Sequence, residues 1–177
     1  MIRFSTSALV GAAALVVAGM AAPALRQAHW RLAMDPQSVT CLPWTLYVEH
    51  LQAPAQLRRG QIVVLREDAV DKAAALNPGL RAFASAPAGK MVAAIPGDTV
   101  ELRGDAIWVD GHYLGKTWLS GWVDRKFQGL SVPWTPGQPY VVPPGKVMVM
   151  GTRSLAFDSR YFGLVNARQI HGVAYPL

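Results

Sequence analysis

The chain has 177 residues, of which 51% are hydrophobic and 16% are charged, and its formal net charge is +6. This length suits one domain with a hydrophobic core plus a short extra segment, and the composition excludes a disordered chain. No run of Lys and Arg reaches five residues. A nucleic-acid partner is therefore not expected, whereas a basic domain lying against anionic lipid headgroups fits the charge.

The first predicted element is the apolar segment 7–25, which contains no charged residue over 19 positions. As a helix rising about 1.5 Å per residue, it just spans a hydrocarbon core of about 30 Å. It is either a retained anchor or a cleaved signal peptide, for which residues 19–21 offer small side chains. Its length favours the anchor. We expect residues 1–26 to form a cytoplasmic end and transmembrane anchor, and residues 27–177 to form one domain across the membrane.

The rest of the chain predicts short strands separated by turns. Strands are expected at 61–65, 91–95, 99–102, 106–109, 140–142, 146–150 and 173–175, with turns at 104–105, 110–111 and 143–145. One helix is expected over 67–76, ended by an Asn-Pro-Gly sequence. This pattern predicts a mainly antiparallel β domain on a membrane stalk.

Few residues offer chemistry. The four histidines lie far apart and show no metal-binding spacing, and no glycine-rich phosphate loop occurs, so neither a metal nor a nucleotide is expected. The single cysteine, Cys41, cannot form an intramolecular disulfide, and it is either a small buried residue or a reactive thiol. Lys90 stands just before the predicted apolar strand 91–95. A lysine can replace histidine as a base where burial disfavours its charged form.

Four sequence boxes follow the apolar segment in a recognisable order. They are Cys41-Leu42-Pro43-Trp44-Thr45-Leu46-Tyr47, Arg59-Gly60-Gln61-Ile62-Val63-Val64, Lys90-Met91-Val92-Ala93-Ala94-Ile95-Pro96-Gly97-Asp98 and Phe157-Asp158-Ser159-Arg160-Tyr161-Phe162-Gly163. In this order, with 49 residues from Cys41 to Lys90, the chain resembles signal peptidase I, the S26 serine peptidase family. It resembles most closely the TraF-like conjugative-transfer branch of that family.

The resemblance implies a signal-peptidase-type antiparallel β domain and a peptidase that forms an acyl-enzyme. Cys41 stands where the family has its serine nucleophile, and Lys90 matches the general base. The backbone N–H of Cys41, with Ser38 or Thr40, is then expected to hold the oxyanion. Supporting roles fall to Asp158, Ser159 and Arg160, with the Asp158–Arg160 charge pair tying the last box to the lysine strand. Contacts with an extended substrate are expected from Leu42, Pro43, Val92 and Ala93. The resemblance implies no metal and no cofactor.

The resemblance also implies a substrate and a location. The substrate is a translocated precursor protein, for which a conjugative pilin fits best, and the outcome is either hydrolysis or cyclisation. The expected location is the bacterial inner membrane, with a single pass and the catalytic domain in the periplasm. The lipid bilayer and components of a conjugative secretion system are the expected partners, without nucleic acid.

Two departures from the family pattern leave a second interpretation open. Val39 and Ala156 stand where the family has hydroxyl side chains. A thiol ionises more easily than a hydroxyl and is more nucleophilic, so Cys41 is compatible with activity. The alternative is a catalytically inactive, membrane-anchored assembly factor that retains the peptidase fold.

Several aromatic residues have no assigned role. Trp108, Trp118, Trp122 and Trp134, with Phe127, form either a surface that dips into the bilayer interface or ordinary core packing.

Overall fold

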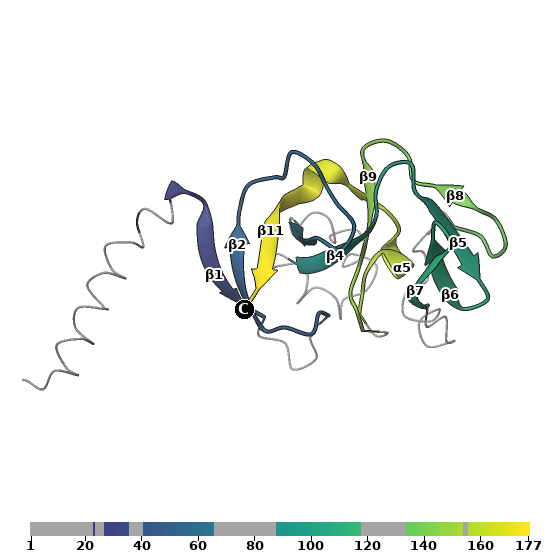
Figure 1. The fold of residues 1–177 in the computed structure, drawn as a ribbon, viewed down its shortest axis with the longest axis horizontal. Helices are drawn as coiled ribbons and strands as arrows, with labels where there is room; N and C mark the ends of the chain where they lie inside the picture. Colours follow the sequence, from purple (N-terminus) through teal and green to yellow (C-terminus); the bar gives the residue numbers. More distant parts are fainter. Residues whose placement is uncertain (1–22, 24–26, 36–40, 66–87, 118–133, 154–155) are drawn as a thin grey trace, which may run out of the picture.

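The structure is a computed structural model that describes residues 23, 27–35, 41–65, 88–117, 134–153 and 156–177. Eleven strands of this part of the chain form two sheets, of seven and four strands. The strand order is β1-β2-β11-β3-β4-β9-β10 in the larger sheet and β7-β6-β5-β8 in the smaller one (Figure 1). Every pair of neighbouring strands is antiparallel, which confirms the mainly antiparallel β part of the predicted fold class.

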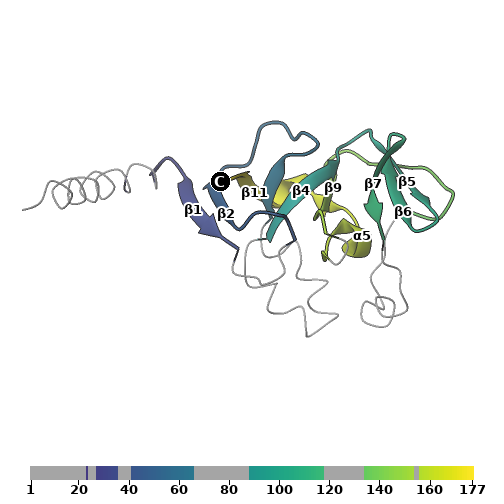
Figure 2. The ribbon, with the colours of Figure 1, turned by 60° about the horizontal axis from the view of Figure 1, so that its bottom comes forward.

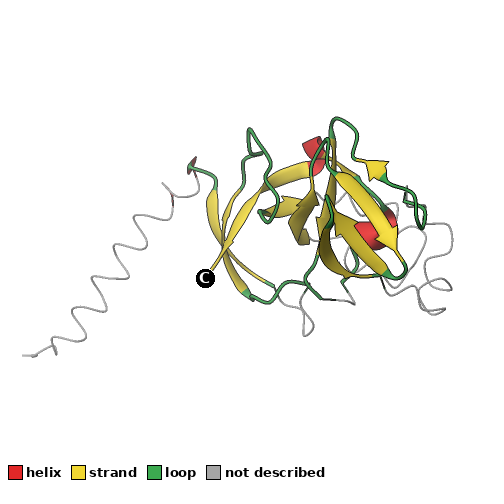
Figure 3. Ribbon diagram, turned by 45° about the vertical axis from the view of Figure 1, so that its right-hand side comes forward, coloured by secondary structure: helices red, strands yellow, loops and turns green. Residues whose placement is uncertain are grey.

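The elements have the following bounds. The larger sheet contains β1 (Trp30–Met34), β2 (Leu46–His50), β3 (Ile62–Leu65), β4 (Ala88–Ala94), β9 (Lys146–Met150), β10 (Val165–Asn166) and β11 (Ile170–Pro176). The smaller sheet contains β5 (Thr99–Arg103), β6 (Ala106–Val109), β7 (His112–Lys116) and β8 (Tyr140–Val141). Two short helices, α5 (Ser159–Phe162) and η2 (Ala167–Gln169), follow β9, and strands dominate the remainder (Figure 3).

Glycine turns fix the hairpins of the smaller sheet. Gly104 has φ of 61° in the predicted turn between β5 and β6. Asp110 and Gly111 both have positive φ, 47° and 76°, as a two-residue hairpin loop requires. The second turn leads into β7, a strand that the sequence prediction did not include. The predicted strands at 140–142 and 146–150 both form, but β8 pairs with β5 and β9 pairs with β4, so they belong to different sheets.

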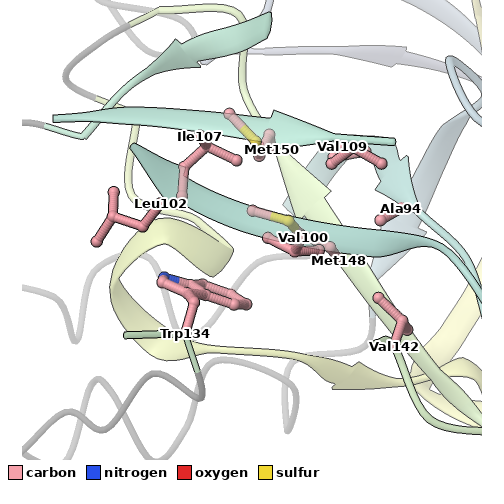
Figure 4. Packing of buried hydrophobic residues seen from close by; sticks show 10 residues of the cluster. Ala94, Val100, Leu102, Ile107, Val109, Trp134, Val142, Met148 and Met150 are labelled. Carbon is pink, nitrogen blue, oxygen red and sulfur yellow. The ribbon is translucent and has the colours of Figure 1, made fainter. Parts of the chain in front are cut away.

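A buried apolar cluster joins the two sheets. Val100, Ile107 and Val109 of the smaller sheet pack with Met148 and Met150 of β9, and the ring of Trp134 completes the cluster (Figure 4). Trp134 is only 4% exposed, so the bilayer interpretation of this residue is wrong and the core interpretation is right. Full burial of such side chains stabilises the fold by about 1.5–3 kcal/mol each.

The two sheets lie side by side along the long axis of the molecule. Figure 1 and Figure 2 both show β1 at one end and β5, β6 and β7 at the other, with β4 and β9 between them. Within the described ranges, no helix is long and apolar enough to cross a membrane. The predicted anchor lies outside these ranges apart from Pro23, as does the helix predicted over 67–76, and both stay predictions. The division into residues 1–26 and 27–177 stays a prediction as well.

Candidate active site

Cys41 lies in a turn, residues 41–45, that leads into β2. The side chain of Leu42 is 2% exposed and packs in a core cluster with Tyr47 and Ala174. The hydroxyl of Tyr47 donates to the carbonyl of Trp44 at 2.8 Å and so closes the turn. Leu42 and Tyr47 are the two buried residues of the box from Cys41 to Tyr47, and they fix the position of the half-buried Cys41.

Lys90 lies inside β4 and not just before a strand, as the sequence had suggested, because β4 begins at Ala88. Its Cα pairs with that of Val63 in β3, and the side chain is 4% exposed. The amine Nζ lies 2.8 Å from Sγ of Cys41. The fold thus brings together the two residues that the ordered boxes singled out, and it places the amine against the sulfur.

Gly151 allows the chain after β9 to pass against Cys41. A Cβ at this position would lie 2.5 Å from Cβ of Ala156, 2.7 Å from the carbonyl oxygen of Cys41 and 3.2 Å from Cβ of Cys41. These separations are too short for any side chain, so the position requires glycine. The backbone N–H of Thr152 then donates to the Cys41 carbonyl at 3.0 Å. Ala156, which lacks the family's hydroxyl, lies directly against Gly151.

The last box forms a buried polar network beside this turn. Asp158 caps α5, and its carboxylate accepts hydrogen bonds from Nε and Nη2 of Arg160 at 2.8 and 2.6 Å. The same carboxylate accepts from the backbone N–H of Gly151 at 2.8 Å, and Oγ of Ser159 accepts from that of Val149 at 2.9 Å. These bonds tie the box to β9 and the residue after it. The sequence analysis predicted that these bonds would connect the last box to the lysine strand, β4. They connect it instead to β9, which is the neighbour of β4 in the sheet.

The charge of Arg160 is fixed by its surroundings. Burial lowers the pKa of its guanidinium, but the hydrogen bond and charge of Asp158 outweigh burial. Smaller contributions come from Tyr161 and Cys41, and the pKa of Arg160 lies above its usual value. For the Tyr47 hydroxyl, burial has the opposite effect and raises the pKa. Negative charge at Asp35 and Cys41 raises it further. The thiol of Cys41 therefore lies within electrostatic reach of both a fixed cation and a buried phenol.

A cavity of about 270 Å³ is lined by neighbours of Cys41 and Lys90, although neither of these two residues is among its described lining residues. Residues 91–93 follow Lys90 on β4, and Gly151 and Thr152 contact Cys41. The lining also contains His112 and Leu114 of β7, which the sequence prediction missed because it lacked that strand. The turn at 110–111 was the available signal, since a two-residue turn of this type joins paired strands.

The remaining predicted site residues are distributed as follows. Val92 and Ala93 line the cavity, and their contact with substrate stays a prediction. Leu42 points into the core cluster and Pro43 is exposed, and neither is among the described lining residues. Ser38 and Thr40 lie outside the described ranges. Oγ of Ser159 is engaged by the backbone of β9. In the described part of the chain, no group of three or more His, Cys, Asp and Glu side chains is arranged to hold a metal ion.

Comparisons with known proteins show what this chain is similar to. The family model described as signal peptidase, peptidase S26, matches residues 5–176. Signal peptidase IB of Staphylococcus aureus is 33% identical over 92 residues, which cover 47% of this chain and 48% of that protein. The conjugal transfer protein TraF of Agrobacterium fabrum is 34% identical over 102 residues, which cover 58% of this chain and 54% of that protein.

A looser likeness is found among solved structures. The signal peptidase I of Enterococcus faecalis V583 is 22% identical, with a TM-score of 0.38, over 67% of this chain and 96% of that one. The aligned regions span about half the length of the curated relatives. Because the family model covers nearly all of the sequence, the chain belongs to the signal peptidase family, peptidase S26, and its likeness to TraF agrees with the TraF-like branch of that family.

Proposed function

We propose that this protein is a membrane-anchored endopeptidase that cleaves a translocated precursor with Cys41 as nucleophile and Lys90 as base. The observation that carries the proposal is the 2.8 Å separation between Lys90 Nζ and Cys41 Sγ in a chain of this peptidase family. A nucleophile and its base within hydrogen-bonding reach are the signature of covalent catalysis.

The proposed first step is attack by the Cys41 sulfur, as thiolate beside the Lys90 ammonium, on the carbonyl carbon of the scissile bond. A sulfur–carbon bond forms and the carbonyl oxygen takes the negative charge. The carbon–nitrogen bond then breaks, and the leaving amine takes a proton from Lys90. The second nucleophile then attacks the thioester carbonyl carbon and gives a proton to the neutral amine of Lys90. The carbon–sulfur bond breaks, which releases the acyl product and returns the thiolate. Water as the second nucleophile gives hydrolysis, and the precursor's own terminal amine gives a cyclic product.

The remaining parts of the proposal follow the family. The backbone N–H of Cys41, with Ser38 or Thr40, stabilises the oxyanion, and one such donor typically contributes about 2.7–4 kcal/mol in the transition state. The name of the relative TraF, a conjugal transfer protein, supports a pilin precursor and secretion-system partners. Residues 1–26 are the anchor, and residues 27–177 form the periplasmic peptidase domain at the inner membrane.

Precursor processing by a matched set of variants tests the proposal. Cys41→Ala and Lys90→Ala are expected to abolish processing in cells, whereas Lys116→Ala, at a 61% exposed side chain, is expected to leave it intact. Cys41→Ser restores the family's usual nucleophile and is expected to retain some processing. Thermal melting of the purified full chains checks that each variant folds. Normal processing by both alanine variants would contradict the enzyme proposal.

A second function is favoured by one observation. Ala156 presents a methyl group against Gly151, where the family has a hydroxyl that helps to orient the lysine. A chain that lost this hydroxyl together with the serine nucleophile fits an inactive, membrane-anchored assembly factor. That function predicts that the alanine variants still support assembly of the secretion system. Loss of assembly together with loss of processing would contradict it.

A further inference from the structure

The cavity beside the Cys41–Lys90 pair is lined by both sheets. Residues 91–93 of β4 and 150–152 at the end of β9 belong to the larger sheet and the residue stretch after it, and the opposite lining comes from β6 and β7 of the smaller sheet. Its volume is about 270 Å³. An apolar cavity of about 150 Å³ already holds a benzene ring. This cavity therefore has room for a large side chain, and a methyl group would leave most of it empty.

The lining of the cavity is mainly apolar. It contains six apolar side chains, Met91, Val92, Ala93, Val109, Leu114 and Met150. Leu114 is 38% exposed, so a ligand in the cavity would remove apolar surface of this residue from water. Removal of apolar surface from water is the main favourable contribution to binding in such a place.

The polar side chains of the lining already have partners. Arg59 donates to the carboxylates of Asp98 and Asp110. Nδ1 of His112 lies 3.0 Å from the carbonyl oxygen of Asp110, and because a carbonyl oxygen only accepts, this nitrogen carries the proton. The hydroxyl of Thr152 lies 3.5 Å from a backbone carbonyl oxygen. The permanent charge in the described lining is therefore paired, and the cavity suits an apolar group better than an ion.

The pairing of β4 decides which part of a precursor can reach the cavity. One edge of β4 pairs with β3 from Ala88 to Met91, and the other edge pairs with β9 from Met91 onwards. Of the strands that the structure describes, none pairs with the second edge between Ala88 and Lys90. An extended peptide can therefore add to β4 before Lys90 but not after it. The cavity lies after Lys90, beyond the place where such a peptide would pair.

The proposed reaction directs one part of the precursor to this place. The leaving amine must lie close to Lys90, because it takes its proton there. Gly151 and Thr152, which line the cavity, both contact Cys41. With the acyl segment on the free edge of β4, the segment that begins with the leaving amine passes beside the cavity. We propose that the cavity is a specificity site for a large apolar side chain on the leaving-amine side of the scissile bond; this inference rests on the proposed function.

Leu114 is the residue of this specificity site that can be changed with the least disturbance. His112 and Leu114 line the cavity from alternate positions of β7, and alternate residues of a strand share a face. Tyr113 lies between them, and its ring packs 5.7 Å from the ring of Trp108 instead. Leu114 is thus expected to select the occupant, and Tyr113 offers a matched control on the same strand.

Cleavage of a peptide series by the full chain in detergent micelles tests the proposal. The quenched-fluorescent peptides carry alanine before the cleaved bond and alanine, leucine, phenylalanine or glutamate after it. The value of kcat/KM should be about tenfold higher with leucine or phenylalanine than with alanine, and lowest with glutamate. Leu114→Arg should raise the glutamate-to-leucine ratio of kcat/KM at least about tenfold, because it places a cation in the cavity wall. Tyr113→Arg should leave this ratio unchanged.

Two results would overturn the specificity site and leave the peptidase proposal standing. One is similar kcat/KM for all four peptides with the unaltered chain. The other is a ratio that stays constant in Leu114→Arg, although thermal melting shows that this variant folds. A ratio that rises equally in Leu114→Arg and Tyr113→Arg would mean attraction by net charge alone, and it would also overturn the site.

Photo-cross-linking gives a measurement that does not need catalysis. The full chain with Cys41→Ala is irradiated with the leucine peptide in which photo-leucine replaces leucine, and adducts are located by mass spectrometry. Adducts are expected on Leu114 or Met91, and an excess of the leucine peptide, but not of the glutamate peptide, should suppress them. Adducts only outside the lining, or none, would overturn the site. Adducts in the cavity without cleavage of any peptide by the unaltered chain would support the binding site and contradict the peptidase.

Discussion

Arg160 and Lys90 are two buried basic side chains, 3% and 4% exposed, that are held in different ways. The Arg160 guanidinium donates to both carboxylate oxygens of Asp158 and to three backbone carbonyls. The Lys90 amine lies against the sulfur of Cys41. The first cation is paired with a fixed anion and holds backbone segments together. The second faces a group that can itself gain or lose a proton, as a catalytic pair requires.

The difference shows that two buried basic residues of one small region can have different roles, one in holding the fold and one in the proposed reaction. A buried ion pair with satisfied hydrogen bonds fixes a conformation, and removal of one partner leaves an uncompensated charge. A buried amine against a thiol has no such permanent counter-charge, and a base within hydrogen-bonding reach of a nucleophile is typical of a catalytic pair. Substitutions at Arg160 should therefore change mainly the free energy of unfolding, and substitutions at Lys90 should change mainly the rate of processing.

The largest effect is expected from Lys90→Met, which removes the amine and keeps an unbranched side chain of similar length. Proton transfer by a positioned side chain contributes about 10²–10⁴-fold, so processing should fall by at least about 10²-fold. The free energy of unfolding should stay the same or rise, because a buried amine is exchanged for an apolar group. Processing kinetics and urea unfolding of the purified full chain measure both quantities. A large loss of stability would place Lys90 with Arg160 on the support side of the comparison.

Arg160→Met should do the opposite. It leaves the Asp158 carboxylate buried without its cation, and the expected loss of stability is about 3–5 kcal/mol. Arg103→Met is the matched control, since that side chain is 49% exposed and pairs with Glu101 at the surface. Its cost should be at most about 1 kcal/mol. Urea unfolding compares the two variants, and similar midpoints would show that the buried network contributes no more than a surface pair.

Gly151→Ala tests how closely the two groups are coupled. The added Cβ would meet Ala156 and Cys41, and overpacking of this kind costs about 1–3 kcal/mol. It should also push the turn away from Lys90, and a misplacement of about 1 Å can lower a rate by about 10²-fold. Gly89→Ala is the matched control, since nothing lies within 4 Å of an added Cβ there. Processing and alkylation of the Cys41 thiol should fall in the first variant only. Equal rates in both would mean that the contact at Gly151 does not position the thiol.

Much of the fold was readable from local patterns. The strand 62–65 is a continuous apolar run, and the hairpin of β5 and β6 is marked by its glycine turn, so both were predicted close to their observed bounds. The proximity of Cys41 to Lys90 was a different kind of prediction. It came from the order of the boxes and not from any periodicity, because 49 residues separate the two and only the sheet brings them together.

The missed elements depend on partners that are distant in the sequence. β1 and β2 face apolar side chains outward and carry Tyr47 and Glu49 inward, so their alternation does not distinguish a core face. β10 has only two residues and exists through its pairing with β9. The carbonyls that bind Arg160 belong to two segments, and no spacing rule connects Arg160 to the carbonyl of Lys116, 44 residues before it. Long-range pairing, and not local propensity, decides such features.

The exposed ion pair of Arg59 and Asp110 extends the comparison of charged groups, and its substitution should change the stability least. Arg59 donates to Asp98 at 2.7 Å and also to Asp110, whose carboxylate accepts from the backbone N–H of Thr99 at 2.8 Å. The bond from Thr99 is the largest cause that lowers the pKa of Asp110, and Arg59 adds to it. A carboxyl group with a lowered pKa stabilises the folded state above its unfolded pKa, and this contribution disappears as the pH falls through the folded pKa.

Asp110→Asn should therefore lower the melting temperature slightly at neutral pH, and the gap to the unaltered chain should close in acid. Arg59→Gln keeps the bond from Thr99, so it should reduce the pH dependence only in part. Melting curves of the three chains from neutral to strongly acidic pH measure both differences. A gap that stays constant with pH would mean that Asp110 acts through its shape in the turn and not through its charge. Of the two pairs compared, only Asp158–Arg160 would then support the fold through its charges.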